Sequence, residues 1–229
     1  ITFVGCSRWL SGRAKKSYLL RGKAVLSIPN PIDTKVYHPM DQGMARELLG
    51  LPSGKRLLLF GALNVTDKRK GIDYLIEALR RMEKQDVELV VFGQVKDDIR
   101  GLFPVPIHSM GYLSDESKIV ALYNAVDMFI TSSLEENLPN TIMESMACGT
   151  PCVGFEIGGI PEMIDHRVNG YVANYKDAGD LANGIQWVLE HEDRLALSDA
   201  CVKKVQENYT EEVVAKQYTT LYEKLLKGE

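Results

Sequence analysis

Short apolar runs of strand length alternate along the chain with longer stretches in which apolar residues recur every three or four positions. Most of the runs are rich in Val, Ile, Leu and Phe, which is typical of strands in a parallel sheet that helices cover on both faces. Strands that alternate with helices are the sequence pattern of an α/β domain. We therefore predict an α/β fold, a Rossmann-like three-layer sandwich with a mostly parallel sheet.

The predicted elements fill most of the chain. Strands are predicted at residues 2–5, 24–28, 57–60, 88–92, 107–110, 128–131, 152–155 and 171–173. Helices are predicted at residues 8–20, 45–49, 72–83, 116–124, 141–148, 180–190, 193–207 and 211–226. The helix at 72–83 carries its apolar residues on one stripe, so we expect it to pack on the sheet.

Composition narrows the class of protein. The 229 residues are 45% hydrophobic and 25% charged, as in ordinary soluble domains, and no apolar run is long enough to cross a bilayer. A net charge of −4 argues against a nucleic-acid surface, because phosphate backbones select broad basic faces. The four cysteines form no CxxC pair, so reduced thiols in a cytosolic protein are expected.

The segment EENLPNTIMESMACGTP, residues 135–151, joins a predicted strand to a predicted helix. Backbone N–H groups near Asn140, Thr141 and Ile142 would start this helix and form a seat for phosphate oxygens. Thr141 and Glu144 have the spacing of a capping box, which predicts that the Glu144 side chain returns to the first turn. Glu136 precedes the helix in a loop, where solvation is the alternative to a ligand contact.

Two further loops follow predicted strands and have the composition of ligand sites. Lys68, Arg69 and Lys70 directly precede the helix at 72–83, where cations oppose the helix dipole unless an anion lies between them. A solvated charge run is the alternative. The pair Gly158–Gly159 indicates a turn, with close approach to a ligand as the second reading. Neither a P-loop nor a GxGxxG motif is present, which disfavours a nicotinamide-dependent dehydrogenase.

Taken in order, these segments resemble the C-terminal, donor-binding half of the retaining GT-B glycosyltransferases of group 1, also called family 4. The similar segments are IPNPIDTKVYHP, FGALN with KRKGIDYLIEAL, MGYLSDE, ENLPNTIMESMACGTPCV and GGIPEMI. They cover nearly the whole chain, and the E-x7-E spacing from Glu136 to Glu144 is the most specific element.

The resemblance implies a role for each matching residue. Glu136 would lie beside the transferred sugar, Glu144 would accept hydrogen bonds from the ribose, and Lys70 would neutralise the diphosphate. Glu136 and Lys70 are the implied catalytic residues, with Glu136 assigned to positioning and electrostatics because the leaving phosphate is thought to act as the base. The remaining implied substrate-binding residues are Gly61, Arg69, Tyr112, Leu113, Asn137, Leu138, Asn140 and Thr141.

The sequence departs from the family at Ala62, where a phosphate-binding arginine is usual. We expect Arg69, displaced in an enlarged loop, to take over that charge. No metal and no cofactor are expected, because fixed cations and helix-start amides stabilise charge that develops on a leaving diphosphate. The pair Asp97–Asp98 is interpreted as solvated.

The resemblance also divides the chain and implies partners. Residues 1–30 would be a remnant of an N-terminal domain and linker, 31–208 the donor-binding domain, and 209–229 a helix that returns to the N-terminal domain of the same parent chain, with Tyr218, Leu221 and Tyr222 exposed or covered by a partner. The implied function is transfer of a hexosyl group from a nucleotide-diphosphate sugar to a glycan or lipid-linked acceptor, in the cytoplasm or at the inner face of the membrane. The alternatives are a GT-B sugar-nucleotide 2-epimerase and a noncatalytic binding module.

Overall fold

The computed structural model describes residues 1–64, 67–82, 86–94 and 100–227. Its main sheet has six parallel strands in the order β5-β4-β3-β6-β7-β8. These strands are β3 (Arg56–Asn64), β4 (Val87–Gln94), β5 (Ile107–Gly111), β6 (Met128–Thr131), β7 (Cys152–Phe155) and β8 (Gly170–Ala173). The predicted parallel α/β sheet is therefore confirmed.

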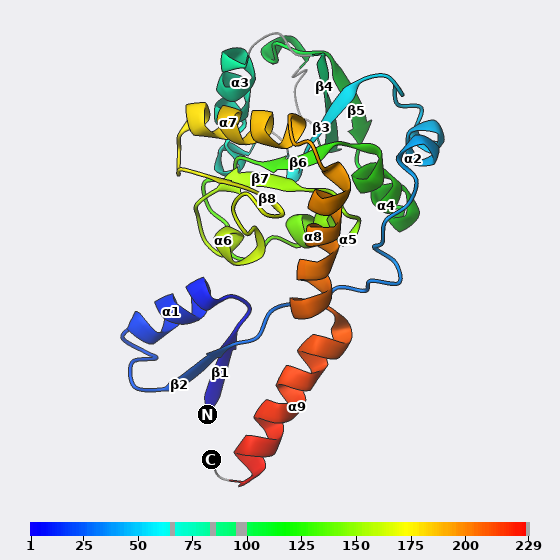
Figure 1. Cartoon of the computed structure of the whole chain (residues 1–229). Coiled ribbons are helices and arrows are strands. Elements are labelled where there is room, and N and C mark those ends of the chain that lie inside the picture. The colour runs from blue at the N-terminus through cyan, green and yellow to red at the C-terminus, as the bar shows by residue number, and fades with distance from the viewer. Residues whose placement is uncertain (65–66, 83–85, 95–99, 228–229) are drawn as a thin grey trace.

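Helices cover both faces of this sheet, which makes three layers (Figure 1). One face carries α3 (Ile72–Arg81) and α7 (Ala178–Leu189). The other face carries α2 (Gln42–Leu49), α4 (Glu116–Ala125), α5 (Asn140–Ala147) and α8 (Arg194–Asn208). Two short 3₁₀ turns, Lys68–Lys70 and Arg100–Leu102, lie in connections.

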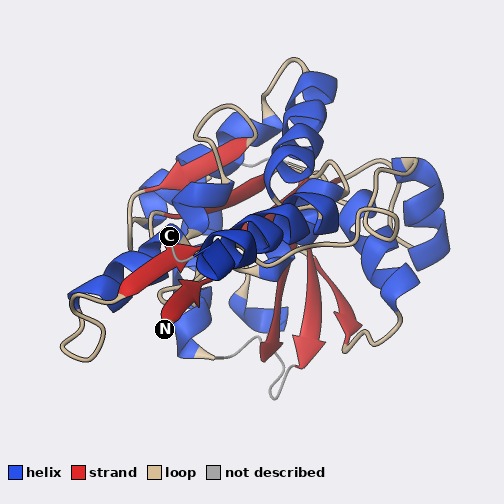
Figure 2. Cartoon of the chain, turned by 90° about the horizontal axis from the view of Figure 1, so that it is seen from below, coloured by secondary structure: helices blue, strands red, loops and turns tan. Residues whose placement is uncertain are grey.

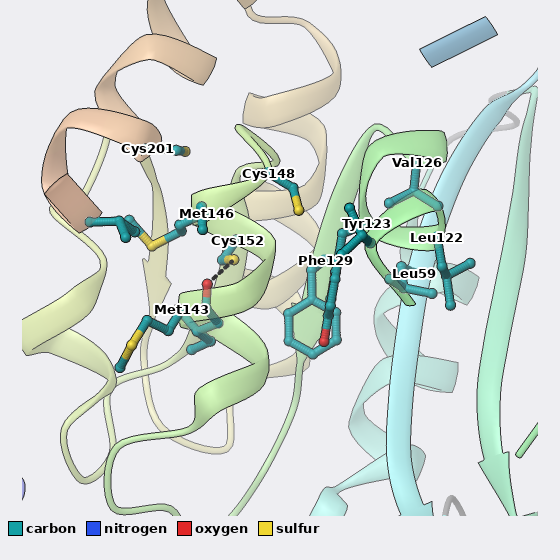
Figure 3. Close-up of a cluster of buried hydrophobic side chains, with 14 of the residues drawn as sticks. Leu59, Leu122, Tyr123, Val126, Phe129, Met143, Met146, Cys148, Cys152 and Cys201 are labelled. Carbon is teal, nitrogen blue, oxygen red and sulfur yellow. Dashed lines mark hydrogen bonds between the residues drawn. The ribbon is translucent and has the colours of Figure 1, made fainter. Parts of the chain in front are cut away.

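The alternation of side chains along each strand produces two cores. In β3, Leu57 and Leu59 face the core on the α4 and α5 side, whereas Leu58 and Phe60 face the core under α3 and α7. All four are fully or almost fully buried, which explains why the strand is a continuous apolar run in the sequence. Figure 3 shows part of the first core, where side chains of α5 lie on one side and those of α4 and β6 on the other.

A smaller unit precedes the six-stranded sheet. It consists of β1 (Thr2–Gly5) and β2 (Ala24–Ser27), paired in parallel, and the connecting helix α1 (Arg8–Lys16). The last helix, α9 (Glu211–Lys227), lies beside this unit (Figure 1). Leu221 of α9 is 8% exposed and packs with Ile28 and Val214. Neither alternative expected for Leu221, exposure or a covering partner, holds, because the chain itself buries this side chain. Tyr218 is partly buried against the same cluster, and Tyr222 is 58% exposed.

Several details differ from the sequence predictions. Helix α1 ends at Lys16, four residues earlier than predicted, where Ser17 leaves the helical conformation. The single helical turn α6 (Ile160–Met163) was not predicted, because four residues are too few to show a helical period. The predicted helix end at Glu83, the pair Asp97–Asp98 and the side chain of Ala62 lie outside the described residues. All four cysteines are free. Among the described helices, none is long and apolar enough to cross a membrane.

Candidate functional site

The predicted site lies at the point where the strand order of the sheet reverses. The chain runs from β3 outward through β4 and β5, and then returns to place β6 on the other side of β3. In open parallel sheets, the crevice beyond the carboxyl ends of two such strands is where ligands bind. Lys70 follows β3 and Glu136 follows β6, so both residues start from the two strands at this reversal.

Lys70 and Glu136 are in direct contact across this point. Lys70 Nζ lies 2.5 Å from Glu136 Oε1, and the two side chains are 33% and 15% exposed. The backbone of the Lys68–Lys70 turn is fixed to the loop after β6, because Leu134 N donates to Arg69 O and Ser132 Oγ donates to Lys70 O. The structure thus brings together the two residues implied as catalytic.

Gly71 explains how the basic turn approaches so closely. Its φ is 64°, in the left-handed region that favours glycine. A Cβ atom at this position would lie 2.0 Å from Ser132 O. Any other residue would therefore move Lys70 away from the loop that carries Glu136.

The paired glycines after β7 contact the backbone of the same loop. A Cβ on Gly158, whose φ is 60°, would lie 1.8 Å from Glu136 O. Gly159 N donates to Asn137 O at 2.5 Å. These glycines therefore allow the segment after β7 to approach the backbone of the Glu136 loop closely.

Glu144 does not form the predicted capping box. Helix α5 begins one residue earlier than predicted, with Pro139 at the N-cap and no side-chain hydrogen bond there. Glu144 Oε2 instead accepts a 2.8 Å hydrogen bond from the Tyr123 hydroxyl on α4. Burial raises the pKa of Glu144, and the nearby Glu116 carboxylate raises it further, against the opposing effect of the Tyr123 hydrogen bond. Among the described residues, no hydrogen bond or ion pair joins Glu144 to Lys70 or Glu136.

A surface pocket of about 520 Å³ adjoins Glu136. It is lined by Trp9, Arg13, Arg69, Leu134, Glu135, Glu136, Asn137 and Ile157. Arg69 lines this pocket, and its Nη2 lies 2.7 Å from Asp67 Oδ2. Hydrogen bonds from the Arg69 side chain and backbone lower the pKa of Asp67 to about 2. The positive charge of Arg69 is thus shared with a carboxylate.

Trp9 and Arg13 of α1 were missed by the sequence analysis. Arg13 lies over the Trp9 ring, with 5.2 Å between its Cζ atom and the ring centroid. Their helix is attached to the site because Ser7 Oγ donates to Asn137 Oδ1 at 2.5 Å. Glu162 of α6 also accepts hydrogen bonds from the backbone N–H groups at the start of α1. These contacts span more than 100 residues, and no local sequence signal indicates them.

The other predicted ligand contacts occupy different environments. Tyr112 is 61% exposed after β5, whereas the side chains of Leu113 and Leu138 pack in or against the core. Only the backbone of Leu138 is therefore available to a ligand. Gly61 lies under the Phe92 ring, where a Cβ would come within 1.9 Å of a ring carbon. Asn140 and Thr141 form the first turn of α5.

The described residues hold no cluster of three or more His, Cys, Asp or Glu side chains that would bind a metal ion. The positive charges that face the site belong to Lys70, Arg69 and Arg13. The uncapped first turn of α5 adds the positive end of a helix dipole. The arrangement therefore suits a ligand that places an anionic group near these cations and a hydrogen-bond donor near the Glu136 carboxylate.

Comparisons with known proteins identify the family of this chain. The chain belongs to the group 1 glycosyltransferases, because the family model "Glycosyl transferases group 1" matches residues 54–191, more than half of the chain. The N-acetyl-alpha-D-glucosaminyl L-malate synthase of Bacillus anthracis is 25% identical over 213 residues, 90% of this chain and 55% of that protein. The chain spans about half the length of the curated relatives it matches.

Two solved structures show the same fold. Sucrose-phosphate synthase from Thermosynechococcus elongatus has a TM-score of 0.82 and 23% identity, over 99% of this chain and 58% of that one. Anabaena HepE in complex with UDP-glucose has a TM-score of 0.79 and 19% identity, over 97% of this chain and 63% of that one. The predicted fold of the GT-B glycosyltransferases is confirmed.

Proposed function

We propose that this chain binds a nucleotide-diphosphate sugar at the reversal point of the sheet and serves as the donor-binding part of a hexosyltransferase. The observation that carries the proposal is the contact between Lys70 and Glu136 at the ends of β3 and β6. The UDP-glucose complex of the structurally similar HepE supports the choice of donor class. The parent protein would transfer the sugar to a glycan or lipid-linked acceptor with retention of configuration.

The chemistry requires positive charge on one side of the sugar and a hydrogen-bond acceptor on the other. Cleavage of the sugar–phosphate bond places negative charge on the leaving diphosphate. In the proposed mechanism Lys70 and the first-turn amides of α5 stabilise that charge. Glu136 accepts hydrogen bonds from sugar hydroxyl groups and keeps the Lys70 ammonium in place. No metal ion takes part in these steps.

Glu144 is assigned to the ribose. The Tyr123 hydroxyl donates to Oε2 of this carboxylate. In the proposal, the other carboxylate oxygen accepts a hydrogen bond from a ribose hydroxyl. Arg69 is assigned to the diphosphate in place of the arginine missing at Ala62, although its pairing with Asp67 reduces its available charge. This pairing is the specific observation that favours the alternative of a noncatalytic binding module.

The proposal predicts which part of a ligand each residue holds. We would measure thermal stabilisation by UDP, GDP, ADP and inorganic pyrophosphate. A ligand at 100 times its Kd adds about 2.7 kcal/mol, which corresponds to roughly 5–11 °C for a chain of this size. Lys70→Gln should weaken binding of UDP and pyrophosphate alike, whereas Glu144→Gln should weaken only nucleotides. Lys203→Gln, an exposed change on α8, is the matched control.

Each outcome of this thermal-stabilisation assay tests one part of the proposal. Stabilisation by one nucleotide identifies the donor base. An unchanged response in Lys70→Gln would refute the assignment of Lys70 to the diphosphate. The absence of stabilisation by every nucleotide at millimolar concentration would refute donor binding by this chain and favour an interaction module.

A further inference from the structure

The turn between α1 and β2 carries a concentrated positive charge. Residues 1–32 contain six Lys or Arg and no Asp or Glu, although the whole chain has a net charge of −4. Four of these cations and two exposed apolar side chains form what we call the basic tip: Lys15, Lys16, Tyr18, Leu19, Arg21 and Lys23. Figures 1 and 2 both show this turn projecting from the body of the molecule.

The exposure of the basic tip is built into an ordered turn. Arg21 N donates to Ser17 O at 3.0 Å, and Lys23 N donates to Leu20 O at 2.9 Å. This hydrogen bonding leaves Tyr18 94% exposed and Leu19 82% exposed. Within the described residues, no carboxylate forms an ion pair with any of the four cations of the tip. The part of the chain that the structure describes thus provides neither a countercharge nor an apolar cover for the tip.

We propose that the basic tip docks on an anionic lipid surface. Cations near such a surface are attracted by its negative potential, while exposed Tyr and Leu side chains enter the boundary between headgroups and acyl chains. A nucleic acid would attract the cations equally, but it offers no apolar layer for Leu19. The combination of four unpaired cations with an adjacent apolar pair therefore favours the lipid surface.

The basic tip and the proposed donor site are built from different residues. Lys70 follows β3 and Glu136 follows β6, whereas the tip joins the last residues of α1 to β2. Because the two surfaces share no residues, the lipid proposal stands independently of nucleotide binding. Variants of the tip should keep the wild-type thermal response to nucleotides.

Co-sedimentation with vesicles tests the proposal directly. The chain should sediment with vesicles of phosphatidylcholine and phosphatidylglycerol, and not with phosphatidylcholine alone. Each Lys removed should lower partitioning about fivefold, so that Lys15→Gln/Lys16→Gln loses roughly 25-fold. The matched control, Lys118→Gln/Lys203→Gln, removes the same charge from exposed positions on α4 and α8 and should bind as the wild type does.

A second variant separates the apolar contribution from the charge. Tyr18→Ser/Leu19→Ser keeps all four cations and removes the two apolar side chains. At high salt the charge attraction is screened, so this variant should lose the vesicle binding that the wild type retains there. Wild-type binding by Lys15→Gln/Lys16→Gln, or equal binding to neutral vesicles, would overturn the proposal. So would tight binding of duplex DNA without vesicle binding, or a dimer in solution that Tyr18→Ser/Leu19→Ser converts to monomers.

Discussion

The contact between Gly158 and the Glu136 backbone allows a quantitative test of how the site is held. In Gly158→Ala the new Cβ would lie 1.8 Å from Glu136 O, whereas carbon and oxygen need about 3.3 Å. The loop must therefore shift by more than ~1 Å. The left-handed conformation alone costs ~1–2 kcal/mol in a residue other than glycine, and the overpacking adds ~1–3 kcal/mol.

Gly50 provides a control for the conformational part of this cost. Its φ is 64°, and nothing lies within 4 Å of a Cβ built there. At ~3 °C per kcal/mol for a chain of this size, Gly50→Ala should lower the Tm by about 3–6 °C and Gly158→Ala by about 6–15 °C. Because Glu136 would move relative to Lys70, only Gly158→Ala should also lose thermal stabilisation by UDP. Equal losses of Tm together with an intact UDP response in both variants would refute the tight loop contact.

Three further predictions concern other charged groups. Asp127→Asn should cost about 3–5 kcal/mol in urea unfolding, because the buried carboxylate accepts from Arg46 and from Leu57 N; a loss below ~1 kcal/mol would contradict this. Affinity for UDP should fall as the pH is lowered through the raised pKa of Glu144, because protonation removes the acceptor, and isothermal titration of Glu144→Gln should give a flat profile over the same range. Arg69→Ala should weaken UDP binding more than Lys68→Ala does. Equal small effects would refute the proposal that Arg69 takes the role of the phosphate-binding arginine that is missing at Ala62.

The strands could be predicted because burial on both faces leaves a direct trace in the sequence. Residues 57–60 are a continuous apolar run, and residues 152–155 are apolar except for Gly154. The structure buries all of these residues. The order of the strands leaves no such trace. That β6 pairs with β3 rather than with β5 depends on how the connections cross the sheet. The sequence analysis therefore predicted the strands and a mostly parallel sheet, and made no prediction of the strand order.

Local spacing was a poor guide to the partner of Glu144. The pattern from Thr141 to Glu144 matches a capping box, yet the helix starts with Asn140 after Pro139. Thr141 therefore lies inside the first turn, and the carboxylate turns to Tyr123. The spacing of the two residues is the same in either arrangement, so the sequence alone cannot distinguish a cap from a tertiary hydrogen bond.

The arrangement around the start of α5 reconciles two acidic side chains with a proposed anionic ligand. A carboxylate beside a helix N-terminus would normally take up its free amides. Here Tyr123 binds Glu144, and Lys70 binds Glu136, so within the described residues neither carboxylate caps the helix. Ile142 N donates to Pro139 O, so the amides of Asn140 and Thr141 are the ones that the proposal assigns to ligand oxygens. The Lys70 ammonium offsets the repulsion that Glu136 would exert on a diphosphate. Lys70 is therefore needed to make this loop compatible with an anion as well as to bind one.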